Sequence, residues 1–242
     1  MQTYRQICIS LLLLLLWGCA SVQPQTTQQQ PVQTAPPDEH SGQDALPEGE
    51  GWWAARFRIV RPDGEPPRWY VGALLAGEVI APVFETRYRD ILVWRVHRRA
   101  GNDDYGHVFS FIFYSTPEAA RRIYADISAN PVLAQLRQEN KVSWVGFDDL
   151  HKINKPYIED TSDPHWSVPV QKTWPALIMG ASRMWLDLVG ELADTHADVA
   201  DLEQRYELVQ QDLTGIWANE GQHAVLHHMS AIFAYQPLLI KY

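Results

Sequence analysis

Residues 91–118, ILVWRVHRRAGNDDYGHVFSFIFYSTPE, decide the fold of this chain. Two β-rich runs, residues 91–98 and 107–114, flank a turn segment rich in Gly, Asn and Asp at residues 101–106. This pattern predicts an antiparallel hairpin. Residues 115–118 then provide a hydroxyl N-cap, a proline at the first helical position and an acid in the first turn. A helix is therefore predicted to follow the hairpin directly.

A strand is predicted before this hairpin. Residues 54–61 alternate apolar and charged side chains, with Phe57 and Ile59 on one side and Arg56 and Arg58 on the other. Because successive side chains of a strand point to opposite faces of a sheet, one face of this strand is expected to be buried and the other solvated.

Helical signals surround the hairpin. Residues 70–80 favour a helix, although their valine, glycine and aromatic content would also permit a strand. The helix that follows the hairpin is expected to run to about residue 128, and a second short helix after Pro131 to span residues 132–138. Residues 142–147 form another predicted strand. The buried face of the first of these helices is expected to comprise Ala120, Ile123, Tyr124 and Ile127.

The resulting order is strand, helix, strand, strand, helix, strand. This order predicts an α+β domain with a ferredoxin-like antiparallel sheet and helices on one face. The polar, proline-punctuated segment at residues 148–172 is too long for an ordinary connection. Its Tyr157, Trp166 and Trp174 suggest that it packs, and we expect it to wrap the sheet or line a groove.

The last part of the chain is predicted to be a helical hairpin. A helix at residues 175–192 has a wide apolar face, and a helix at residues 198–213 has a narrow seam. The partner of this seam is predicted to be either residues 217–235, folded back after Thr214 and Gly215, or a second copy. The wide face comprises Leu177, Ile178, Ala181, Met184, Trp185, Leu188, Val189 and Leu192, and the seam comprises Val199, Leu202, Tyr206, Val209 and Leu213.

Residues 11–19, LLLLLLWGC, end a short apolar run on a small residue and a cysteine. The run is shorter than the roughly 20 residues that span a bilayer. Its end resembles the lipobox of bacterial lipoprotein precursors. The resemblance implies cleavage after Gly18 and acylation of Cys19, and Ala20 implies sorting to the outer membrane, with the protein on the periplasmic face. Two or more acyl chains would hold the protein there stably.

Four regions are predicted: a signal peptide at 1–18, a lipidated N-terminus and disordered Gln/Pro-rich linker at 19–51, an α+β domain with its long loop at 52–172, and a helical segment packed on it at 173–242. Such a linker would span roughly 30 Å. The leader removes Cys8 and lipid occupies Cys19, so the mature chain would lack thiols for disulfides, nucleophiles or metal sites. A net charge of -9 argues against nucleic-acid binding.

One group of residues has the spacing of metal ligands. Glu220, His223 and His227 would share one side of a helix, and Glu-x-x-His occurs in carboxylate-bridged di-iron bundles, which need two such motifs. The chain has a single copy, and a solvated polar face explains these residues as well. No cofactor is predicted.

Other groups of residues have structural explanations beside chemical ones. Asp187 and Glu191 follow Arg183 as an ion-pair ladder would. The acids of the loop could hold a cation, or could serve in Asx turns and caps. Ser182 lacks the context of a nucleophile elbow. The loop candidates are Asp160, Asp163 and His165.

Positive charge is concentrated in the first half of the domain, which indicates either a site for an anionic ligand on the sheet or charge complementarity within the chain. Neighbouring tryptophans would either stack on ligands or belong to the core. The arginines are Arg56, Arg58, Arg61, Arg68, Arg87, Arg89, Arg95, Arg98 and Arg99, and the tryptophans are Trp52, Trp53, Trp69 and Trp94.

These observations favour a noncatalytic binding or assembly protein of the cell envelope. It would contact the membrane through acyl chains on Cys19 and another envelope protein, or a second copy, through its sheet-side groove or C-terminal helices. The alternative is an envelope hydrolase or metal-dependent enzyme with a nonlocal site gathered from Asp148, Asp149, His151 and His165. A structural lipoprotein without a specific ligand is a third possibility.

Overall fold

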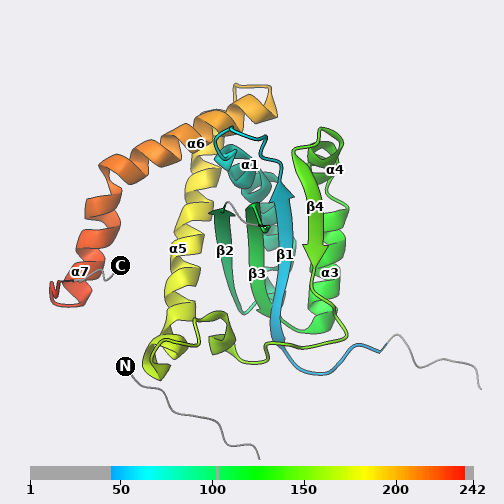
Figure 1. Ribbon diagram of the computed structural model, residues 1–242, viewed down its shortest axis with the longest axis vertical. Coiled ribbons are helices and arrows are strands. Elements are labelled where there is room, and N and C mark those ends of the chain that lie inside the picture. The colour runs from blue at the N-terminus through cyan, green and yellow to red at the C-terminus, as the bar shows by residue number, and fades with distance from the viewer. Residues whose placement is uncertain (1–44, 102–103, 238–242) are drawn as a thin grey trace, which may run out of the picture. The chain divides into compact units, whose positions relative to one another are not determined.

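The computed structural model describes residues 45–101 and 104–237. The predicted signal peptide, Cys19 and the linker up to residue 44 lie outside these residues. The described chain is an α+β structure around a four-stranded sheet of order β2-β3-β1-β4, in which all neighbouring strands are antiparallel (Figure 1). The strands are β1 (Gly51–Ile59), β2 (Val93–Ala100), β3 (His107–Ser115) and β4 (Val142–Phe147).

The predicted hairpin and the helix after it are confirmed. Strands β2 and β3 pair antiparallel, and helix α3 (Pro117–Ser128) starts where the sequence indicates. The Thr116 hydroxyl accepts a hydrogen bond from the Ala119 amide at 3.2 Å, which satisfies one of the free donors of the first turn. Asn130 caps the short helix α4 (Pro131–Gln138) in the same way.

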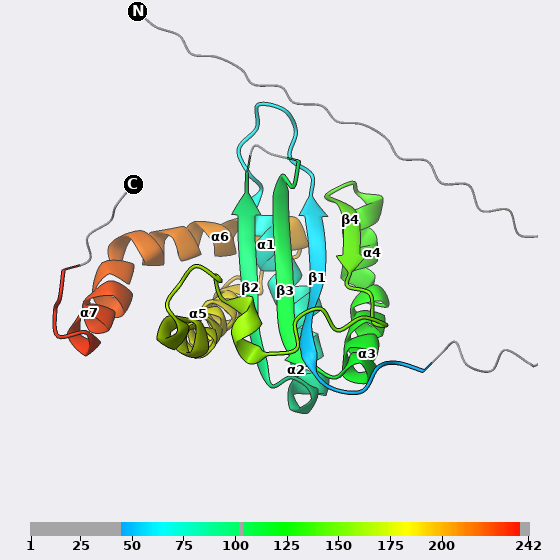
Figure 2. The same ribbon diagram turned by 60° about the horizontal axis from the view of Figure 1, so that its bottom comes forward.

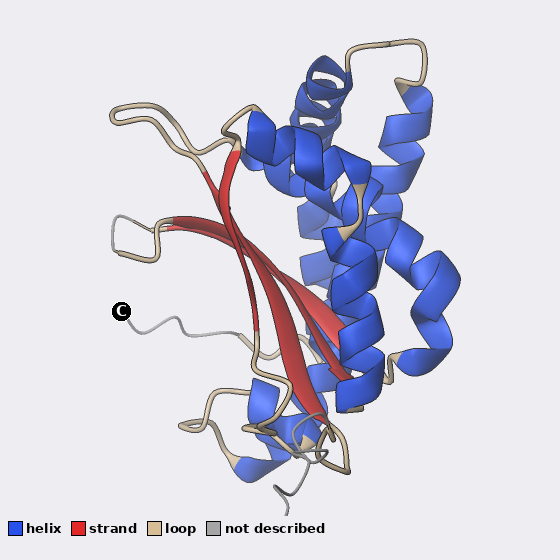
Figure 3. Cartoon of the chain, turned by 90° about the vertical axis from the view of Figure 1, so that its right-hand side faces the viewer, coloured by secondary structure: helices blue, strands red, loops and turns tan. Residues whose placement is uncertain are grey.

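The ambiguous segment before the hairpin is helical. It comprises α1 (Trp69–Leu74), a π-helical stretch η1 (Leu75–Ile80) and α2 (Ala81–Arg87), followed by the short 3-10 helix η2 (Tyr88–Asp90). Its buried residues pack against the sheet, so tertiary packing decides the alternative that local composition leaves open. Figure 3 shows most of the helices gathered on one face of the sheet.

The core lies between this face and the helices. The largest side chains that the sheet buries there are Trp53 and Phe57 of β1 and the phenylalanines at alternate positions of β3, namely Phe109, Phe111 and Phe113. Burial of one such side chain contributes about 1.5–3 kcal/mol. Trp52, Trp53 and Trp94 are buried, and Trp69 is half-buried.

Helix α5 (Val168–Thr195) lies beside edge strand β2. The Val96 amide donates to the buried Ser182 hydroxyl at 3.1 Å, which gives this serine a structural role. The predicted wide apolar face is only partly covered. Leu186 and Val189 are buried, whereas Leu177 and Met184 are 50% and 46% exposed. The prediction that the whole face packs on the domain is therefore wrong at these positions.

Helix α6 (Leu202–Asn219) packs its narrow seam against α1 and η1, and not against the last helices or a second copy as predicted. Tyr206 is buried, and its hydroxyl donates to Glu78 Oε1 at 2.8 Å. The helix continues through Thr214 and Gly215, where a turn was expected.

The chain after α6 does not form the expected fold-back onto it. A π-helical stretch η4 (Gln222–His227) and helix α7 (His228–Ile232) follow α6. These elements, named here the C-terminal arm, stand away from α5 in Figure 1. No described helix combines the length and apolar composition needed to cross a membrane.

Candidate functional site

The sheet face opposite the helices gathers basic side chains. Strand alternation puts Arg56 and Arg58 of β1 on this face, because their neighbours Ala55, Phe57 and Ile59 point into the core. Arg95, His97 and Arg99 alternate in the same way on β2. The registers align His97 with Ser110 and Arg56 in one row, and Arg99 with Val108 and Arg58 in the next.

Arg99 and Arg58 therefore flank Val108 in one row, and His97 and Arg56 flank Ser110 in the adjacent row. We call Arg56, Arg58, His97 and Arg99, together with Trp144 of β4, the basic face. Trp144 lies opposite Arg58 in the β1–β4 register, is 47% exposed, and has the Arg58 guanidinium 5.7 Å from its ring centroid. This places an aromatic surface beside a charge, an arrangement that can hold both acidic and apolar groups.

Three arginines gather on this face although the chain has a net charge of -9. Partial burial and the charges of Arg95 and Arg99 lower the pKa of His97. The Arg56 guanidinium donates to Asp148 Oδ1 at 2.6 Å, and Arg58 donates to the Asp104 carbonyl at 3.4 Å. Because the Arg58 partner is a neutral carbonyl, its positive charge is not cancelled by that contact.

The long segment after β4 closes the other end of the same face, as the sequence led us to expect (Figure 2). Trp52 Nε1 donates to the carbonyls of Tyr157 and Ile158 at 3.0 Å each, and the Tyr114 hydroxyl donates to the Pro156 carbonyl at 2.6 Å. The 3-10 helix η3 (Ile158–Thr161) belongs to this segment. These contacts lie at the Trp52–Tyr114 end of the sheet, whereas at the end with Arg58, Val108 and Arg99 the Arg99 guanidinium lies 5.4 Å from the ring centroid of Tyr105.

Arg95 joins this segment to β2. Its guanidinium donates to the Thr161 hydroxyl at 2.9 Å and lies 5.4 Å from the ring centroid of Trp174. Trp174 in turn packs edge-on against Trp166. Arg95 therefore holds the segment in place and is not part of the open surface.

The acids of this segment hold its own backbone. Asp149 accepts from the His151 amide at 3.0 Å, and Asp163 from the His165 amide at 2.8 Å, which are Asx-turn contacts. Asp160 accepts from the Tyr157 amide at 2.9 Å. These contacts support the structural interpretation of the loop acids, and the candidate nonlocal enzyme site built on them gains no support.

The predicted metal ligands lie on the C-terminal arm. The rings of His223 and His227 stack with centroids 5.2 Å apart, and His228 packs 5.3 Å from both. Glu220 is exposed at the end of α6. Among the residues that the structure describes, no group of three or more His, Cys, Asp or Glu side chains is arranged to hold a metal ion. The metal assignment therefore stays a prediction.

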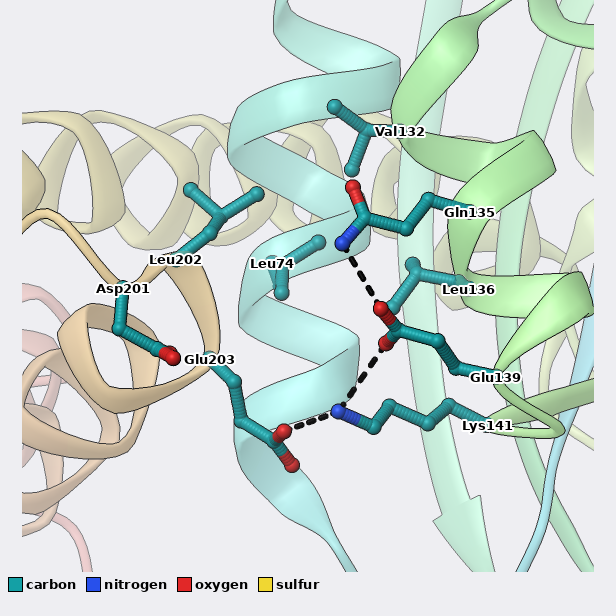
Figure 4. A pocket seen from close by; sticks show the side chains of 9 residues that line it. All are labelled: Leu74, Val132, Gln135, Leu136, Glu139, Lys141, Asp201, Leu202 and Glu203. Carbon is teal, nitrogen blue, oxygen red and sulfur yellow. Dashed lines mark hydrogen bonds and ion pairs between the residues drawn. The ribbon is translucent and has the colours of Figure 1, made fainter.

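A hollow of about 200 Å³ lies between α4 and the start of α6 (Figure 4). The Lys141 ammonium bridges Glu203 and Glu139 across it, and the Tyr70 hydroxyl also donates to Glu203. Burial and the Glu203 carboxylate raise the pKa of Tyr70. These groups satisfy one another's hydrogen bonds and connect α1, α6 and the start of β4. We therefore assign the residues that line this hollow a structural role.

A second hollow of about 320 Å³ lies between residues 61–64 and the β2–β3 turn, near the Arg58–Arg99 end of the sheet. His107 lines it and is 4% exposed, with its Nδ1 atom unpartnered. Burial, together with the charges of Arg98 and Arg61, lowers the pKa of His107 to about 4. The imidazole is therefore neutral at pH 7.

Arg98 behind this hollow is a buried cation. Its Nη2 atom donates to the Trp69 carbonyl at 2.5 Å and to Gln210 Oε1 at 2.7 Å, and its guanidinium lies between the rings of Trp69 and Trp185. Burial lowers its pKa to about 10. Arg98 points to the core side of β2 and links three helices to the sheet.

No protein-family model, curated protein or solved structure matches this chain. The functional interpretation therefore rests on the geometry of the described residues. The sequence indicated the arginines of the basic face. It did not single out Trp144 or His97, because their place beside these arginines depends on the order of the strands in the sheet.

Proposed function

We propose that this protein is a noncatalytic binding protein of the cell envelope whose basic face holds an acidic segment of another envelope protein. The observation that carries the proposal is the row Arg99–Val108–Arg58–Trp144, which crosses all four strands of the sheet at the end near the β2–β3 turn. Two cations separated by an aliphatic side chain and followed by an exposed indole fit a segment that carries both carboxylates and apolar side chains.

The same proposal includes the membrane anchor. Acyl chains on Cys19 would hold the protein on the periplasmic face of the outer membrane, and the linker would let the domain reach partners roughly 30 Å away. An intact-mass measurement of the native protein tests this. The expected mature chain starts at an acylated Cys19, and an unmodified N-terminus at another position would contradict it.

We also propose that the domain is ferredoxin-like. Its strands and helices follow one another in the split βαβ order along the chain, β1, α1, β2, β3, α3, β4. The strand order β2-β3-β1-β4 and the one-sided helices support this assignment. In such an arrangement the face without helices is available for binding.

A photoreactive residue in place of Val108 tests the binding proposal in cells. Val108 lies between Arg58 and Arg99, so we expect it to yield an adduct with an envelope protein, while the same residue at the exposed Ala125 of α3 should not. In the Arg58→Glu background the Val108 adduct should fall about tenfold, which corresponds to roughly 1.4 kcal/mol.

The matched control for that charge reversal is Arg121→Glu. Arg121 is an exposed arginine that pairs with Glu118 within α3, and this helix lies on the side of the sheet opposite the basic face. The substitution changes net charge by the same amount and should leave the adduct intact. Equal adducts at positions 108 and 125, or equal losses in the two charge reversals, would refute the basic face as the binding surface.

A further inference from the structure

Helix α5 carries an apolar stripe on the side that faces away from the domain. Val170, Leu177 and Met184 are 44%, 50% and 46% exposed. They are spaced by seven residues, which places them along one line of the helix with a drift of about 20° per step. Gly180 lies between the last two. We call these four residues the outer stripe.

The outer stripe lies opposite the residues by which α5 packs on its own domain. At about 100° per residue, Leu186 and Val189 point away from Leu177 and Met184, and both are buried. A helix at the surface of a soluble domain ordinarily carries polar side chains on its outer side. Here the apolar face predicted from the sequence is wider than the surface that the domain covers.

The C-terminal arm leaves the stripe uncovered. The exposed fractions of Leu177 and Met184 are those in the presence of the arm, and Figure 1 shows α7 at a distance from α5. A Cβ atom added at Gly180 would meet nothing within 4 Å. The centre of the stripe is therefore open, and its missing side chain permits another backbone to come close.

We propose that a second copy of this chain covers the outer stripe, with the two α5 helices antiparallel and the two-fold axis between Gly180 and Ala181. In this arrangement Leu177 packs against Met184 of the partner subunit, and the reverse contact follows by symmetry. The two glycines lie at the crossing point. The proposal uses the helical side of the molecule and does not depend on the basic face.

Charge favours the antiparallel direction. Across this axis the Arg183–Asp187 ion pair of one chain comes within one helical turn, along the helix axis, of Lys172 of the partner subunit. Glu191 comes close to the first turn of α5 in the partner subunit, where the free backbone amides favour a carboxylate. A parallel pair in register would instead bring each of these groups beside its own copy. The stripe is thus complementary to itself in one direction only.

Engineered cysteines test the geometry. The full chain contains only Cys8 and Cys19, so both are replaced with serine and the protein is purified in mild detergent. Leu177→Cys and Met184→Cys are prepared with different tags, mixed and oxidised. A mixed disulfide is expected at about tenfold the level given by a pair of differently tagged Ala125→Cys chains, because Ala125 is exposed on α3, away from the stripe.

Each cysteine variant alone is the control for direction. In the antiparallel pair, two Leu177→Cys positions are seven residues apart along the axis, about 10 Å, beyond the roughly 4.4–6.8 Å between the Cα atoms of a disulfide. Neither variant should therefore link to itself. Self-linked Leu177→Cys chains, or a mixed disulfide no more abundant than the Ala125→Cys control, would overturn the proposal.

Sedimentation of the same cysteine-free chain gives an independent measurement. We expect two chains per particle at about 10 µM, one chain after Met184→Glu, and two chains after the control Ala125→Glu. A single chain before substitution would overturn the pairing, and so would a Met184→Glu protein that still contains two.

Discussion

Replacement of Gly77 by alanine should destabilise the protein, whereas the same change at Gly190 or Gly215, two helical glycines with open space around them, should stabilise it. A Cβ atom at Gly77 would lie 2.1 Å from the Tyr206 hydroxyl. This hydroxyl cannot simply move aside, because Tyr206 is 1% exposed and donates to Glu78. Alanine at position 77 must therefore push α6 away from η1 or break the Tyr206–Glu78 hydrogen bond.

The expected loss can be worked from three terms. Overpacking of a buried site costs about 1–3 kcal/mol, and loss of a hydrogen bond to a charged group costs about 1.5–3 kcal/mol. The better helix propensity of alanine offsets about 1 kcal/mol. If both costs are incurred, we expect the free energy of unfolding to fall by about 1.5–5 kcal/mol.

Urea titration followed by tryptophan fluorescence measures this difference. The controls are Gly190→Ala in α5 and Gly215→Ala in α6, where an added Cβ meets nothing within 4 Å, and each should gain about 0.5–1 kcal/mol. In a Tyr206→Phe background the nearest atom to the new Cβ is the ring Cζ at 3.0 Å. The Gly77→Ala penalty should therefore fall by about half. A stabilising Gly77→Ala, or effects at positions 77 and 206 that simply add, would refute the packing of α6 on η1.

Two other predictions concern buried charge. The pKa of His107 is lowered to about 4 by burial, Arg98 and Arg61, so the unfolded chain binds more protons than the folded one as pH falls from about 6.5 to 4. Over that range protonation of this group in the unfolded chain should lower the stability of the wild type by up to about 3 kcal/mol. The His107→Gln variant should lose less. If the urea midpoints of wild type and variant fall by the same amount between pH 7.5 and 4.5, this prediction is wrong. Lys141→Met leaves Glu203 and Glu139 without their bridging cation and should lower the free energy of unfolding by about 1–2 kcal/mol. The control Arg183→Ala breaks an exposed i,i+4 pair and should cost about 0.3–0.5 kcal/mol. Equal losses of the two variants in urea titration would show that the ion pairs in Figure 4 contribute no more than a surface pair.

Local signals were sufficient for most of the elements. The turn after β2, the cap at Thr116 and the proline at residue 131 each act within a few residues, so the hairpin, α3 and α4 are found close to their expected bounds. The alternation in residues 54–61 also indicated which side of β1 would be buried. These features depend on backbone geometry that is nearly independent of the rest of the chain.

The surface against which a helix packs cannot be predicted from local signals in the same way. The seam of α6 correctly indicated a narrow contact, but its spacing is equally compatible with the last helices, a second copy or η1. What decides among them is a steric fit between Tyr206 and Gly77, residues far apart in the sequence. The periodicity of α6 cannot reveal this fit, because Gly77 lies in another element and has no side chain that would add to a hydrophobic pattern.

The same reasoning applies to the basic face. Arg56 and Arg58 could be assigned to one side of β1 from alternation alone. Their place beside Arg99 and Trp144 requires the strand order β2-β3-β1-β4, which puts β3 between the two basic strands and β4 at the edge. A different order of the same four strands would scatter these side chains.

The two proposed surfaces are compatible because they lie on different layers of the molecule. The basic face is the side of the sheet without helices, and the outer stripe belongs to a helix beside edge strand β2. A pair joined through α5 would leave both basic faces accessible. Two weak sites on one particle raise the apparent affinity for a partner that repeats its acidic segments, provided that the partner can reach both. Charge repulsion between the two basic faces also disfavours any pairing through the sheet, which leaves the helical side as the surface where two copies can meet.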